Sequence, residues 1–175
     1  MAREIKIVTL VGNPKPASRT LDVGREITDQ IVKRLAEKSV QGQVEFVDIA
    51  TLGAGLLDWG SKQVSEVVEH TLAAELLIVA TPTYKATYTG LIKLFLDRIQ
   101  QNALLGHTAI PVMVAATPLH GLAGETHLRP LLVELGATCP TRAFFILESQ
   151  LDELPTIVAK WLETYEAVLM SSLLV

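Results

Sequence analysis

Residues 5–20 read IKIVTLVGNPKPASRT, an apolar run followed by a turn-forming stretch and two hydroxyl side chains. A run of β-branched residues, with Lys6 as its one charge, is typical of a strand that is buried on both faces. Gly12 and the two prolines after it end that strand, and Ser18 or Thr20 is a suitable N-cap for a following helix. The stretch therefore predicts a strand, a loop and a helix in direct succession.

The same alternation repeats along the chain. Apolar runs rich in Val and Ile predict five strands, at residues 5–11, 44–48, 76–81, 110–115 and 143–148. Apolar residues at helical spacing predict five helices, at residues 23–35, 64–72, 91–99, 128–135 and 154–165. Strict alternation favours parallel strands with helices on both faces of the sheet. We therefore expect an α/β, doubly wound, flavodoxin-like five-stranded parallel sheet of order 2-1-3-4-5, in a single domain over residues 1–175.

Composition excludes several classes of protein. The 175 residues are 49% hydrophobic, which disfavours a disordered polymer, and 15 basic against 19 acidic residues give a net charge of −4. That balance argues against a nucleic-acid partner, which normally selects a basic face. The apolar runs are far shorter than the roughly 20 residues of a membrane span, and Cys139 is the only cysteine, which excludes an internal disulfide. We expect a cytoplasmic protein with no membrane partner.

The loop at residues 12–20 has the composition of an anion site. Backbone N–H groups at a helix start and the positive end of the helix dipole favour a negative charge. Asn13, Ser18 and Thr20 add neutral donors, and Arg19 can add a charge-assisted bond. The loop lacks the Gly-Lys-Ser/Thr of a P-loop, so a terminal monophosphate fits better than a nucleotide triphosphate. The alternative is that Ser18 and Thr20 simply cap the helix.

A second loop, residues 80–90 (ATPTYKATYTG), follows the third predicted strand and would lie at the same sheet edge. Pro82 ends the strand abruptly, so the backbone N–H groups of residues 83–85 are expected to be free to bind a planar heterocycle. Tyr84 and Tyr88 are two of only three tyrosines and suggest ring stacking or a subunit contact. Lys85 could balance an anionic ring or a phosphate, or could be an ordinary surface lysine.

Together the two loops resemble those of the NADPH-dependent FMN reductases. The matching stretches are GNPKPASRT at 12–20 and ATPTYKATYTGLIKLFLD at 80–97, with a weaker likeness in LRP at 128–130 and LGA at 135–137. The chain is most similar to the sulfonate-utilisation branch, which supplies reduced FMN to two-component monooxygenases. The resemblance covers roughly residues 5–148, and the motifs keep their order.

The resemblance implies FMN and NADPH as cofactors and a homo-oligomer, either a dimer or a tetramer. It places the FMN phosphate at Ser18, Arg19 and Thr20, with Asn13 and Pro14 in the same loop. Pro82, Thr83, Tyr84 and Lys85 would border the flavin ring, and Thr117 and Pro118 would close the far side. The 2′-phosphate of NADPH needs a cation, for which the candidates are Lys15, Arg19, Lys85 and Arg129.

Hydride transfer between nicotinamide and flavin is chemistry of the cofactors, so we expect no catalytic side chain. We also expect no metal site, because His120 and His127 lie seven residues apart and fit no standard zinc pattern. Cys139, with no basic neighbour in sequence, is expected to be a packed thiol.

Thr117-Pro118 replaces a Gly-Gly pair typical of the sulfonate branch, which leaves the role of the flavin open. One alternative is a reductase that supplies reduced FMN to a flavin-dependent monooxygenase. A second keeps FMN resident and reduces a quinone, an azo dye or a metal oxyanion. The others are a flavodoxin-like electron carrier, disfavoured by the modest net charge, and a flavin-free interaction domain. The sequence does not choose between NADPH and NADH.

Overall fold

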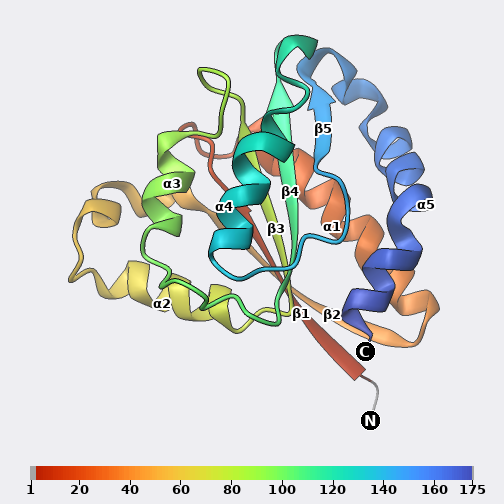
Figure 1. Ribbon diagram of the computed structural model, residues 1–175, viewed down its shortest axis with the longest axis horizontal. Coiled ribbons are helices and arrows are strands. Elements are labelled where there is room, and N and C mark those ends of the chain that lie inside the picture. The colour runs from red at the N-terminus through yellow and green to blue at the C-terminus, as the bar shows by residue number, and fades with distance from the viewer. Residues whose placement is uncertain (1–2, 175) are drawn as a thin grey trace.

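A computed structural model describes residues 3–174 and contains a single five-stranded sheet in that range (Figure 1). The strands run in the order β2-β1-β3-β4-β5, and every neighbouring pair is parallel. Their bounds are β1 Arg3–Val11, β2 Val40–Asp48, β3 Leu76–Pro82, β4 Thr108–Ala115 and β5 Phe144–Leu147. The expected doubly wound, flavodoxin-like order is confirmed.

Helices cover both faces of the sheet, as predicted. They are α1 Arg19–Glu37, α2 Lys62–Leu72, α3 Gly90–Leu96, α4 Arg129–Glu134 and α5 Leu154–Leu173. Helices α1 and α5 pack on one face, and α2, α3 and α4 pack on the other (Figure 1). Short irregular helices occupy 49–57, 118–120 and 148–153, and a π-helical turn spans 124–128. Among the described residues, no helix is both long and apolar enough to cross a membrane.

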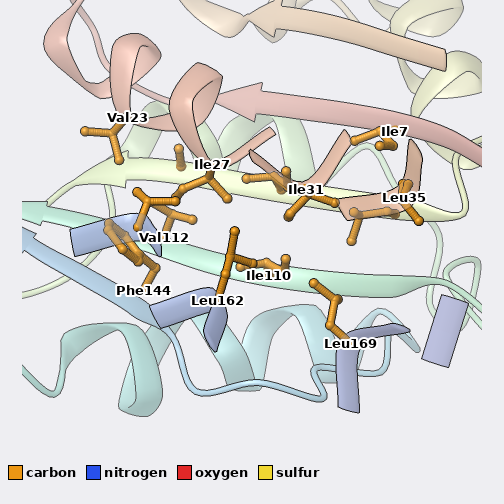
Figure 2. Packing of buried hydrophobic residues seen from close by; sticks show 14 of the residues in the cluster. Ile7, Val23, Ile27, Ile31, Leu35, Ile110, Val112, Phe144, Leu162 and Leu169 are labelled. Atoms are coloured by element: carbon orange, nitrogen blue, oxygen red, sulfur yellow. The ribbon is translucent and has the colours of Figure 1, made fainter. Parts of the chain in front are cut away.

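Two apolar layers explain why the strand sequences are almost continuously hydrophobic. Alternate residues of β1 point to opposite faces: Ile5 and Ile7 enter the layer under α1 and α5, whereas Val8 and Leu10 enter the other. In the first layer the α1 residues Ile27 and Ile31, four apart, pack over the sheet, and α5 adds further side chains (Figure 2). Each strand is thus fixed by burial from both sides.

Several elements extend beyond their predicted bounds, among them β2 and α5. β2 begins at Val40 rather than Val44, because it is an edge strand whose first residues alternate exposed glutamines with Val40 and Gly42. α5 continues to Leu173, because Leu169 and Leu173 recur at helical spacing and are buried against the first layer.

Candidate functional site

The loops after β1 and β3 are joined where these neighbouring strands end. The backbone N–H of Gly12 donates to the carbonyl of Ala80 (2.8 Å), and the Thr89 hydroxyl donates to the carbonyl of Gly12 (2.5 Å). The same Thr89 oxygen caps α3 by accepting from the N–H of Ile92 (3.2 Å). A Cβ atom at Gly12 would lie 2.6 Å from the Cβ of Ile92, so only glycine allows α3 to approach the strand end this closely. These contacts hold the two loops side by side.

The loop between β1 and α1 is ordered by two side chains at its base. The Asn13 carbonyl oxygen accepts from the N–H of Lys15 (2.9 Å), and its amide donates to Thr20 Oγ1 (3.0 Å). Asp48, the last residue of β2, accepts from the N–H of Ala17 (2.9 Å). Ala17 has a φ of +49°, a left-handed conformation that the bond to Asp48 helps to hold.

Ser18 occupies the N-cap position before α1, but its side chain does not cap the helix. Its side chain is 6% exposed, makes no cap hydrogen bond, and its Oγ has no hydrogen-bond partner within residues 3–174. The first N–H groups of any helix lack partners inside the helix, so the backbone donors of the first turn of α1 lie next to this unpartnered hydroxyl. A buried polar group without a partner costs free energy, which an anion bound at this helix end would recover. The donor set therefore fits a phosphate.

A cavity of about 280 Å³ opens at this helix start. Six of the predicted site residues line it, namely Asn13, Ser18, Arg19, Thr20, Pro82 and Tyr84, together with Lys15, Ala17, Val114 and Glu148. The volume is near the lower end of ligand pockets, about 300–1,000 Å³, and so suits a phosphate with its adjoining chain better than a whole flavin. Pro14 is an exposed residue of the same loop and does not line the cavity.

The loop after β3 differs from the expectation in its backbone. The N–H of Thr83 donates to the carbonyl of Val114 (2.7 Å), and the N–H of Tyr84 donates to the carbonyl of Thr87 (2.8 Å). Lys85 and Ala86 both adopt positive φ, at 52° and 67°, and close a tight turn. The prediction that the N–H groups of residues 83–85 are free was thus wrong for the first two. The Thr83 hydroxyl is buried without a partner in the described chain, which leaves a side-chain donor there.

The remaining predicted site residues lie around this edge. Thr117 and Pro118 are exposed directly after β4, outside the cavity lining, as is Lys85 after β3. Strands β3 and β4 pair in parallel register, so both loops leave the same end of the sheet (Figure 1). These three residues therefore lie at the same end of the sheet as the cavity but do not line it.

Arg129 has a structural role that its sequence position did not reveal. Its guanidinium donates to Glu125 Oε2 (2.8 Å), to the carbonyl of Cys139 (2.6 Å) and to the carbonyl of Thr141. Glu125 also accepts from the N–H of Ala143 (2.6 Å). This half-buried guanidinium, with three partners, connects the start of α4 to the segment that precedes β5. Arg129 is therefore a poor candidate for binding a nicotinamide phosphate.

The same guanidinium lies next to the one cysteine. Burial raises the pKa of the Cys139 thiol to about 11, and the nearby Arg129 charge opposes that rise without cancelling it. Arg129 therefore adjoins Cys139 in space, although the two residues are ten positions apart in sequence. The thiol nevertheless packs against the second apolar layer, as predicted.

Two acidic residues that bond to the loop after β1 or to the start of α1 were missed by the sequence analysis. Asp48 ends β2 and holds the loop at Ala17, while Glu148 follows β5 and forms an ion pair with Arg19 at 2.7 Å. Both stand at the carboxyl ends of predicted strands. The predicted strand order could have identified both residues, because the carboxyl ends of parallel strands meet at the same edge of the sheet.

Comparison with known proteins agrees with this geometry. The family model described as NADPH-dependent FMN reductase matches residues 5–152. FMN reductase (NADPH) of Escherichia coli is 31% identical over 149 residues, covering 83% of this chain and 75% of that protein. NADH-dependent FMN reductase SfnF of Pseudomonas fluorescens is 36% identical over 139 residues, covering 75% and 70%. The apo crystal structure of the NADH:FMN oxidoreductase EmoB superposes with a TM-score of 0.78 at 30% identity, covering 92% of this chain and 90% of that one.

Proposed function

The chain belongs to the NADPH-dependent FMN reductase family and is an NAD(P)H:FMN oxidoreductase, and we propose that its FMN phosphate binds in the cavity at the start of α1. The observation that carries the proposal is the buried Ser18 hydroxyl, which lacks a partner among residues 3–174 and adjoins the first N–H groups of α1. Asn13, Arg19 and Thr20 would complete the phosphate site from the cavity wall, with Pro14 in the loop behind it.

We assign the flavin ring to the loop after β3. Pro82 and Tyr84 line the cavity on that side, and the unpartnered Thr83 hydroxyl is a donor for a ring carbonyl or nitrogen. Lys85, Thr117 and Pro118 would border the ring from the rim. Tyr84 is 51% exposed, which leaves its ring available to an arriving substrate.

The chemistry that FMN supplies when bound is acceptance of a hydride from the reduced nicotinamide. The residues of this chain would bind and orient the two partners, which is the main protein contribution to such a reaction. The pairing of the Arg19 guanidinium with Glu148 leaves Lys15 and Lys85, both exposed, as the cations best placed for a nicotinamide phosphate. No acid, base or covalent nucleophile is required of the chain.

We further propose that reduced FMN leaves the site and serves a flavin-dependent monooxygenase. The exposed Arg19 and Lys15 at the cavity rim support this reading, because a flavin held at an open rim can exchange with solvent. We also propose that the chain is a single domain, that it is cytoplasmic, and that it forms a homo-oligomer, either a dimer or a tetramer. Light scattering during gel filtration would measure the oligomer.

Titration with FMN and with riboflavin, followed by flavin fluorescence, tests the binding site. We expect Ser18→Ala to weaken FMN binding by about tenfold and riboflavin binding by less than twofold, because the lost hydroxyl is assigned to the phosphate. Ser65→Ala, an exposed serine of α2, is the matched control. Equal effects of Ser18→Ala on both flavins would exclude the phosphate assignment.

Oxidation of NADPH and of NADH, measured against the concentration of added FMN, tests the role of the flavin. A rate that rises with free FMN supports the exchanging reductase. Saturation at one FMN per chain, with turnover only when a quinone or similar acceptor is present, would instead identify a resident flavin. A protein that binds no FMN would refute both roles.

A further inference from the structure

Glu148 places a negative charge in a cavity that is otherwise suited to an anion. It lies at the start of the 148–153 helix, directly after β5, and lines the cavity together with Arg19. Its Oε2 accepts from Arg19 Nη2 at 2.7 Å, with the two side chains 42% and 65% exposed. Arg19, the cation in the first turn of α1, is therefore paired with a carboxylate.

The cavity has a fixed neutral part and a mobile charged part. Ser18 at the N-cap position and Thr20 in the first turn of α1 are buried, and Thr20 is held by Asn13, so these donors need no rearrangement. Arg19 and Glu148 have long, solvent-exposed side chains, and an exposed ion pair of this kind is weak enough to open. An incoming phosphate can engage the neutral donors directly but must take Arg19 from Glu148.

We propose that Glu148 competes with the flavin phosphate for Arg19 and thereby keeps FMN binding weak enough for exchange. The inference rests on the proposed function, because it assigns the phosphate to this cavity. It makes Glu148 a residue that sets FMN affinity without contacting the flavin ring. The opposite outcome, in which Glu148 holds Arg19 in place for the phosphate, would have Glu148 strengthen FMN binding.

Fluorescence titrations of Glu148→Gln with FMN and riboflavin separate these outcomes. We expect Glu148→Gln to bind FMN about threefold to fivefold more tightly at low ionic strength and riboflavin within twofold of wild type, because the removed charge acts on the phosphate. In about 1 M salt, where the screening length falls to about 3 Å, most of the gain should vanish. Glu153→Gln, an exposed glutamate of the same short helix, makes the same charge change away from Arg19 and is the control.

The Arg19→Gln background tests the mechanism of the gain. If Glu148 acts through Arg19, adding Glu148→Gln to Arg19→Gln should change FMN affinity by less than twofold. A full gain in that background, an equal gain for riboflavin, an equal gain in Glu153→Gln, or unchanged or weaker FMN binding by Glu148→Gln would each overturn the inference. A wild-type protein that binds no FMN would refute the proposed function and this inference together, whereas wild-type binding with an inert Glu148→Gln refutes the inference alone.

Discussion

Replacing Thr89 with valine removes one hydroxyl and keeps the shape of the side chain, at the point where the loops after β1 and β3 meet. Thr89 is 1% exposed, donates to the carbonyl of Gly12 and accepts from the N–H of Ile92. Losing a threonine N-cap costs about 1 kcal/mol. Leaving the buried Gly12 carbonyl without this donor costs about 1–3 kcal/mol more. We therefore expect Thr89→Val to lower the free energy of unfolding by about 2–4 kcal/mol.

Equilibrium unfolding in urea, followed by circular dichroism, measures this change. Thr164→Val is the matched control, because Thr164 is an exposed α5 residue whose hydroxyl donates back to the Lys160 carbonyl of the same helix (3.2 Å). We expect that control to stay within about 0.5 kcal/mol of wild type. A loss below about 1 kcal/mol for Thr89→Val, or one equal to that of Thr164→Val, would refute the reasoning that this hydroxyl holds the two loops together.

Further predictions concern Gly12 and Cys139. Gly12→Ala should destabilise the fold by about 1–3 kcal/mol in the same urea assay, because its Cβ would overlap Ile92, whereas Gly90→Ala, with open space around it, should be neutral or slightly stabilising. Cys139 should react with a thiol reagent at pH 8 about 100-fold more slowly than an exposed cysteine, because its pKa is raised to about 11 from 9.0. Its raised pKa also predicts that the free energy of unfolding falls as the pH rises from about 9 to about 11, since the unfolded chain releases the thiol proton first. Rapid labelling of Cys139, or a free energy of unfolding that does not change over this pH range, would contradict the burial of the thiol.

The sheet could be predicted because parallel strands are buried on both faces. Runs such as LLIVAT at 76–81 leave no polar face, so their apolar composition alone locates a strand. The start of β2 escaped prediction because it lies at the sheet edge, where Gln41 and Gln43 meet solvent and interrupt the pattern. A buried strand can be located from its continuous apolar sequence, whereas the exposed start of an edge strand cannot.

The site was partly predictable for a related reason. Ser18, Arg19 and Thr20 are consecutive in the chain, so their joint chemistry is visible in sequence. Glu148 reaches Arg19 across 129 positions, and only the strand order brings the two residues together. The paired N–H groups of Thr83 and Tyr84 were missed because the turn that closes over them depends on two left-handed residues, neither of which is glycine.

The cavity has fixed neutral donors and a mobile ion pair, and this difference affects how tightly a flavin phosphate could bind. Donors that are fixed before binding contribute to affinity without an ordering cost, and the Asn13–Thr20 bond gives the neutral part that character. The charged part contributes only the difference between the Arg19–phosphate and Arg19–Glu148 interactions. Geometry is therefore set by buried residues of α1, while affinity is adjusted by an exposed pair. Because the second can change without disturbing the first, our proposal predicts that the charge at position 148 moves this site between flavin exchange and flavin retention while the sheet and its loops stay the same.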